Sequence, residues 1–267
     1  MSHRITFIIL YILLFNPVGR VGSTLPENRP GVQLDLPDDP AAKASAIMDY
    51  IDDLWRGKSS VAEVTMEVKT ENWSRTLEMK AWSLGKDYSL VRITAPKKEA
   101  GTATLKAENN IYNYLPKTDR TIKITSGMMM SSWMGSHFTN DDLVKESRYS
   151  EDYNCEVVFD GEREGEMVWE MQLNPKPDAP VIWGKIMFVI RQTDLMPVHA
   201  KYYDEKNILI RTMMFKEYKE MGARTIPSIM RLMPEDKPNE FTELTYNSIE
   251  FDIGLEPSFF SIRNLKN

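Results

Sequence analysis

Apolar and polar side chains alternate in short runs along most of this chain of 267 residues. In residues 62–68, for example, Ala62, Val64, Met66 and Val68 alternate with charged or hydroxyl side chains. A period of two puts alternate side chains on opposite faces of a β-strand, so each run predicts a strand with one apolar and one wet face. Similar runs lie at 73–81, 88–95, 102–107, 111–115, 121–124, 153–159, 166–173, 182–191, 197–203, 208–215, 225–233 and 241–251.

Short turn sequences separate nearly all of these runs, among them Glu71-Asn72 and Asp160-Gly161. Consecutive strands with such short connections pair antiparallel. No linker-like segment follows residue 40, so we expect mainly β structure: a single strongly curved antiparallel sheet, or unclosed β-barrel. Short strands alone cannot fill the hollow of such a sheet. Helices covering the concave side, or a ligand, must occupy it.

One helix is well marked before the first strand. Asp38 or Asp39 can cap it, Pro40 suits its first position, and Gly57 is a natural stop. Its apolar residues recur at helical spacing and form one face that must pack on something apolar. These residues are Ala44, Ile47, Met48, Ile51, Leu54 and Trp55.

Two shorter elements are expected later in the chain. Thr139 or Asn140 can cap a short helix after the methionine-rich segment. Residues 256–262 form a turn or short helix, whose Phe259 and Phe260 can plug the sheet.

The first 23 residues have the pattern of a cleaved secretory signal peptide. Arg4 precedes an apolar run at 5–15 that is too short for an ordinary transmembrane helix, and Val21-Gly-Ser23 supplies small residues for cleavage. The alternative is an uncleaved anchor. No cysteine follows the expected cut after Ser23, so we do not expect a lipidated N-terminus. Residues 24–40 predict an extended lead-in, and 41–267 a single folded domain.

Charge and cysteine content restrict the function classes. The formal net charge is -6, which argues against nucleic-acid binding and against nonspecific adhesion to anionic lipid headgroups. It does not argue against binding the apolar tails of lipids. Cys155 is the single cysteine, so an exported protein of this sequence is stabilised by its core and not by an internal disulfide.

Residue patterns for chemistry are missing. Outside the leader, the histidines are His137 and His199, far apart and without zinc-ligand spacing. There is no glycine-rich phosphate loop and no Gly-x-Ser-x-Gly. Asp141 and Asp142 could be an acid pair, although a role in the first turn of a helix fits them better. We therefore expect no enzyme, no catalytic residues, no metal site and no cofactor.

A methionine-rich segment interrupts the strands at residues 126–135. Methionine is unbranched and polarizable, so a cluster of such side chains adapts to irregular apolar partners. Two interpretations stay open: a movable apolar lid over a cavity, or a core helix that plugs one end of the sheet. The bulky side chains are Met128, Met129, Met130, Trp133 and Met134.

The order of these features resembles a known family. The likeness is carried by the segments 90–96, 101–105 and 111–116 with Lys123 and Ile124, and above all by 127–136 running into 139–143. In order and spacing these resemble the LolA/LolB superfamily of periplasmic lipoprotein carriers, and more narrowly the outer membrane lipoprotein-sorting proteins.

This resemblance implies a LolA-like half-barrel domain at 41–267, with helices over its mouth and a cavity that takes acyl chains. The implied protein is a periplasmic carrier that takes lipoproteins or lipids from an inner-membrane transporter towards an outer-membrane acceptor. The alternative is a sensor or adaptor of the same fold that works with a membrane protein complex.

The resemblance also implies roles for individual residues. Met128–Met134 belong to the cover of the cavity. A gating arginine on a strand is either Arg75 or Arg92, and both also fit as ordinary wet-face residues. The expected apolar cavity and lid residues are Met66, Met79, Leu105, Met128, Met129, Met130, Trp133 and Met134.

Overall fold

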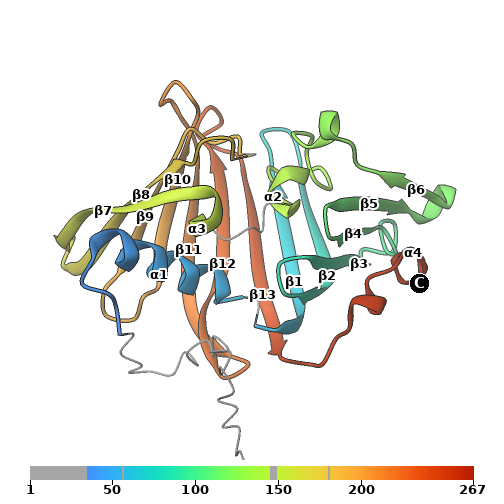
Figure 1. Cartoon of the computed structure of the whole chain (residues 1–267). Coiled ribbons are helices and arrows are strands. Elements are labelled where there is room, and N and C mark those ends of the chain that lie inside the picture. Colours follow the sequence, from blue (N-terminus) through green and yellow to red (C-terminus); the bar gives the residue numbers. More distant parts are fainter. Residues whose placement is uncertain (1–34, 56, 145–148, 180) are drawn as a thin grey trace, which may run out of the picture.

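Thirteen strands form one antiparallel sheet that does not close into a barrel in the part of the chain that the structure describes (Figure 1). The structure is a computed structural model, and it describes residues 35–55, 57–144, 149–179 and 181–267. The predicted leader at 1–23 and most of the lead-in at 24–40 lie outside these residues. The predicted fold class, an open and mainly β sheet with few helices, is confirmed.

The strands follow the predicted runs closely. The first half of the sheet contains β1 (Ser59–Lys69), β2 (Ser74–Leu84), β3 (Tyr88–Ala95), β4 (Ala103–Ala107), β5 (Asn110–Leu115) and β6 (Arg120–Lys123). The second half contains β7 (Tyr153–Arg163), β8 (Glu166–Pro175), β9 (Lys185–Arg191), β10 (Pro197–Tyr203), β11 (Leu209–Met221), β12 (Arg224–Pro234) and β13 (Phe241–Phe251).

The order of the strands decides what lies over the concave face. Each half is a simple meander, and the halves join where β1 pairs with β13, with Met66 opposite Leu244. This pairing leaves β6 at one edge of the sheet and β7 at the other. The chain between these two strands must therefore cross the whole sheet. It contains η2 (Ser126–Met128), α2 (Asn140–Val144) and α3 (Tyr149–Asp152).

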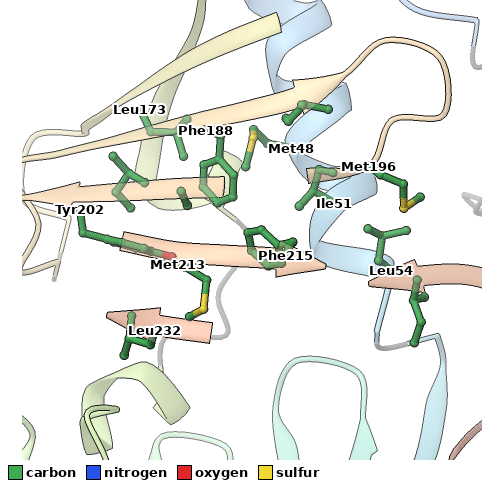
Figure 2. Close-up of a cluster of buried hydrophobic side chains, with 14 of the residues drawn as sticks. Met48, Ile51, Leu54, Leu173, Phe188, Met196, Tyr202, Met213, Phe215 and Leu232 are labelled. Atoms are coloured by element: carbon green, nitrogen blue, oxygen red, sulfur yellow. The ribbon is translucent and has the colours of Figure 1, made fainter. Parts of the chain in front are cut away.

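Helix α1 (Pro40–Asp53) begins as the sequence predicts. The side chain of Asp39 accepts a hydrogen bond from the Ala42 amide at 2.8 Å, and Pro40 takes the first position. The helix ends at Asp53, before the predicted stop at Gly57. Its apolar face packs on the second half of the sheet; Figure 2 shows Met48, Ile51 and Leu54 facing side chains of the strands.

The C-terminal segment covers the opposite face of the sheet. Side chains of β3 alternate, so Val91 and Ile93 belong to the main core while Leu90 belongs to a second cluster. In this second cluster Leu90 packs with Phe260 and Leu265 from η3 (Pro257–Phe259), α4 (Ile262–Lys266) and the residues between them. The predicted plug of Phe259 and Phe260 is thus found on the outer face of β3–β5. A third short turn, η1 (Pro116–Thr118), joins β5 to β6.

In the described residues, none of the helices is long and apolar enough to span a membrane.

Candidate functional site

A cavity of about 310 Å³ lies on the concave face of the sheet. One side is formed by Ile51 of α1 and by Trp55 just after this helix, and another by Trp133 and Phe138 of the segment that crosses from β6 to β7. Asp52, Asp142 and three serines (Ser60, Ser83 and Ser89) also line it, but apolar side chains from the two halves of the sheet form most of the rest of the wall. Among these are Ala62, Val64, Met79, Val91, Phe188, Met213, Phe215, Met230, Leu244 and Ile249.

The lid, which we define as residues 126–139, begins with the single 3-10 turn η2 and is otherwise a folded loop, without an α-helix. Its two arms are held together by backbone hydrogen bonds: the Trp133 amide donates to the Phe138 carbonyl at 2.8 Å, and the Asn140 amide to the Ser131 carbonyl at 3.0 Å. Ser132 and Thr139 form an isolated antiparallel bridge. The lid therefore has the internal bonding of a small hairpin, with residues 134–137 at its tip.

Trp133 is the lid side chain that enters the interior. Its ring is 4% exposed and lines the cavity, and its indole Nε1 donates to the Thr104 hydroxyl at 3.1 Å. A buried indole N–H needs such a partner, so this bond fixes the depth of the ring. The hydroxyl of Thr104 on β4 thus positions the lid.

The lid methionines lie differently from the expectation. Met128 and Met129 are half-buried, Met130 is 56% exposed, and none of the three lines the cavity. Met134 packs at the edge of the main core. The physical reason is the loop conformation of the lid: without a helical repeat, the five bulky residues between 128 and 134 do not share one inward face.

Arg75 holds the tip of the lid from β2. One Nη donates to the carbonyl of Met134, and the other pairs with the Glu99 carboxylate at 3.1 Å. Gly135 follows with a φ of 68°, and a Cβ there would lie 3.1 Å from the guanidinium. A glycine is therefore needed for both the backbone conformation and the approach of Arg75.

His137 holds the tip from the other side. Its backbone amide donates to the Thr242 hydroxyl on β13 at 2.9 Å, and its Nε2 lies 3.0 Å from the Glu240 carboxylate. The hydrogen bonds from His137 and from the Glu71 amide hold the pKa of Glu240 below its usual value. The lid is thus tied to strands on both sides of β1.

Asp142, in the first turn of α2, pairs with Arg211 on β11 through two hydrogen bonds of 2.6 and 2.9 Å. It also accepts from the amide and hydroxyl of Thr139, and the Thr139 hydroxyl accepts from the Asp142 amide at 3.2 Å. The predicted cap at Thr139 is confirmed by this reciprocal pair. Burial would raise the pKa of Asp142, but Arg211 and Thr139 outweigh it and hold that pKa below its usual value.

The sequence interpretation missed Arg211. Its guanidinium is stacked 4.4 Å from the Trp183 ring and 4.6 Å from the Tyr202 ring. It lines a second cavity of about 160 Å³ that shares Phe138, Asp142, Tyr149, Tyr202 and Met213 with the first. A signal was present: Arg211 stands in the register of Met213 and Phe215, where the alternation of β11 calls for an apolar side chain.

The predicted wall residues separate into three groups. Met79 lines the cavity. Met66 is fully buried in the core and is not part of the wall. Leu105 is opposite Leu90 and packs on the outer face against α4, so its assignment to the cavity was wrong. The error follows from the strand period, since a neighbouring residue, Thr104, is the one that faces inwards.

The two candidate gating arginines lie on opposite faces of the sheet. Arg75 contacts the lid, as described above. Arg92 donates to the backbone carbonyls of Asn264 and Leu265 in α4, which packs on the outer face, and not to the lid. Placing Arg92 as a gate was wrong, because residues 90 and 92 share the outer face of β3.

The groups that would support catalysis do not converge. Cys155 is buried, and burial, with Asp52 and Asp49 adding to it, raises the pKa of its thiol to about 12. Burial lowers the pKa of His199, which lies on β10. Among the described residues, no group of three or more His, Cys, Asp or Glu side chains is placed to hold a metal ion. The site is a mostly apolar cavity, and polar contacts hold the lid that covers it.

Several solved structures have a similar fold. A DUF1329 family protein from Desulfovibrio piger matches with a TM-score of 0.75 and 21% identity, over 85% of this chain and 99% of that one. A domain assigned to the outer membrane lipoprotein-sorting proteins, from Vibrio parahaemolyticus, matches with a TM-score of 0.73 and 25% identity, over 85% and 100%. A LolA superfamily protein from Nitrosomonas europaea matches with a TM-score of 0.70 and 18% identity, over 83% and 98%.

Comparison with curated proteins found no match. A family model with the description "Uncharacterized protein" matches residues 85–267, which include β3 to α4 and the whole lid. The chain belongs to this family, and its fold is LolA-like, similar to that of the lipoprotein-sorting domain and of the LolA superfamily protein.

Proposed function

We propose that this protein is a periplasmic carrier that holds an acyl chain of a lipoprotein or lipid in the concave cavity and takes it towards the outer membrane. The observation that carries the proposal is the cavity itself, about 310 Å³ of space with mostly apolar walls between α1, the lid and the sheet. Pockets for small ligands have volumes of roughly 300–1,000 Å³ and mostly apolar walls. The similarity to a lipoprotein-sorting domain agrees with this use of the space.

Binding of an acyl chain here would rest on apolar burial. Each methylene removed from water gains about 0.8 kcal/mol, so ten buried methylenes gain about 8 kcal/mol before the costs of ordering the chain. A carrier must also release its cargo. The contacts that hold the lid tip, from Arg75 and His137, are polar, and water can replace them at a modest net cost in free energy. Opening of the lid therefore requires little free energy.

The path of the cargo completes the proposal. The leader pattern at 1–23 favours export, and an inner-membrane transporter and an outer-membrane acceptor would set the direction of transfer. The cargo is held without being changed, so the proposed activity is binding and not catalysis. The alternative is a sensor or adaptor, for which a solidly packed interior would be the natural design; the cavity favours the carrier.

A matched pair of variants tests the proposal. Ala81 lies on β2 and lines the cavity, so in Ala81→Trp the indole would occupy the space meant for the cargo. Glu78→Trp adds the same side chain at an exposed position of the same strand. Native mass spectrometry and lipid extraction on the gently purified protein measure the bound cargo.

The expected result is acyl-bearing cargo in the wild type and in Glu78→Trp, and little or none in Ala81→Trp. Circular dichroism checks that both variants keep the fold. Wild-type protein without any copurified lipid, together with no transfer of lipid between vesicles, would overturn the carrier proposal.

A further inference from the structure

One end of the sheet combines exposed apolar side chains with unpaired lysines beside the lid. The turns β1–β2, β3–β4 and β5–β6 lie at the same end of the antiparallel meander. We call this end the lid rim: residues 70–73, 96–102 and 115–119, with lid residues 126–135. Figure 1 shows the β1–β2 turn and the lid segment close together at the upper edge.

A groove of about 470 Å³ lies between the β3–β4 turn, the β5–β6 turn and the lid. Met134 and Gly135 of the lid form one wall, and Leu115, Pro116 and Lys117 form another. The groove therefore lies directly against the tip that Arg75 holds. A molecule in the groove therefore also contacts Arg75, Met134 and Gly135, where the lid tip is held.

Large apolar side chains are exposed on the lid rim. Trp73 in the β1–β2 turn is 47% exposed, Met130 on the lid 56% and Leu115 39%. Trp73 is 5.7 Å from the Arg75 guanidinium, so it stands next to the lid fastening. Single exposed apolar residues are normal. Three on one rim, with a tryptophan at the tip of a turn, are typical of a surface that meets another apolar phase.

The lid rim does not share the acidity of the whole chain. The chain has a net charge of -6, whereas the lid rim has three basic side chains, Lys97, Lys98 and Lys117, and three acidic ones, Glu71, Glu99 and Asp119. Glu99 is paired with Arg75, and Asp119 with Lys266. Lys97, Lys98 and Lys117 are exposed and form no ion pair with a described residue. The global acidity therefore does not exclude a local attraction to an anionic surface.

We propose that the lid rim docks on the surface of a membrane that contains anionic lipids. Lys97, Lys98 and Lys117 contact the phosphates, and Trp73 and Met130 lie at the headgroup level, where amphipathic and apolar side chains are stabilised. Docking in this orientation brings the lid tip to the bilayer. The proposal concerns a surface and not the cavity, so it can hold or fail independently of the cargo.

Vesicle flotation of the purified protein tests the proposal, with phosphatidylcholine vesicles and with vesicles that also contain phosphatidylglycerol. A basic side chain near an anionic bilayer raises binding about fivefold, so three together contribute about 100-fold. We expect binding to the anionic vesicles that falls with salt, and a loss of about 100-fold in Lys97→Gln/Lys98→Gln/Lys117→Gln. We also expect a smaller loss in Trp73→Ala.

Matched variants far from the lid rim serve as controls. The triple variant Lys58→Gln/Lys216→Gln/Lys219→Gln removes the same charge from exposed positions of other segments. Ile262→Ala removes an apolar side chain that is 40% exposed on α4. Both controls should bind anionic vesicles like the wild type.

Three results would overturn the proposal: no binding to either vesicle, equal binding to both, or equal losses in the rim and control triples. The first result, no binding to either vesicle, would indicate that the lid rim binds a protein partner instead of a membrane. Native mass spectrometry on the same variants separates this inference from the carrier proposal. Lost vesicle binding with cargo retained supports membrane docking, whereas vesicle binding by a protein that never carries lipid refutes the carrier alone.

Discussion

Replacing Arg75 with methionine should open the lid while leaving the sheet intact. Methionine keeps most of the apolar stem of the arginine and removes the guanidinium that bonds the Met134 carbonyl and Glu99. The internal hydrogen bonds of the lid and the depth of Trp133 are not touched by this change. The variant therefore isolates the fastening of the tip.

The size of the effect follows from the two bonds that are lost. A hydrogen bond from a charged donor contributes about 1.5–3 kcal/mol. The pair with Glu99 adds about 1 kcal/mol or less, because the two side chains are 27% and 22% exposed. The Nε of Arg75 is buried without a partner in the described structure, and its removal offsets part of the loss. A net change of about 2 kcal/mol corresponds to an opening equilibrium about 30-fold more favourable.

Native-state hydrogen exchange measures this equilibrium. The reporters are three amides that donate to lid carbonyls: that of Trp133 in the lid, and those of Asn140 and Asp141 at the start of α2. They should exchange about 30-fold faster in Arg75→Met, while amides of β9 to β12 keep their rates. Arg92→Met is the matched control, because Arg92 binds α4 on the outer face. Unchanged lid exchange in Arg75→Met, or equal acceleration in both variants, would refute the fastening role.

Three further predictions concern other parts of the site. Asp142→Asn leaves Arg211 buried without its counter-ion and should lower the free energy of unfolding by about 3 kcal/mol in urea titrations. Because the folded-state pKa of Asp142 is lowered, this stabilisation is present above the unfolded-state pKa near 4 and is lost as the pH falls through the folded-state value, so wild type and variant should converge in acid. Gly135→Ala, at a φ of 68°, should cost about 1 kcal/mol of lid stability, seen as about fivefold faster exchange of the lid amides. The thiol of Cys155, buried and with its pKa raised to about 12, should react with a disulfide reagent at neutral pH only as fast as the protein unfolds.

The strands could be predicted because their signal is local. Alternation in β1, for example, appears in the sequence and again in its burial pattern, where Ala62, Val64, Met66 and Val68 are buried. The Asp39 cap of α1 was readable for the same reason. The pairing of β1 with β13 is not local, since it joins residues nearly two hundred positions apart, and no turn sequence specifies it.

The candidate site was predicted in position but not in detail. The methionine-rich segment does lie over the concave face, yet Trp133 enters the cavity while Met130 faces solvent. A sequence pattern assigns inward residues only when the backbone repeats regularly, and the lid does not. Arg211 could have been found, because a charged residue in an apolar strand register is a conflict that a fold must resolve with a partner such as Asp142.

The lid makes polar contacts at its tip and an apolar contact through Trp133, and the two have different effects. Polar ties from Arg75 and His137 fix where the tip rests, and water can replace them when the lid opens. The apolar contact of Trp133 closes the cavity, and water cannot replace it without a loss of buried surface. In the proposed carrier, an acyl chain would replace this contact, because it offers the same kind of apolar surface. Cargo would then compensate the opening of the lid where water does not, which would favour an open state with cargo present and a closed state without it.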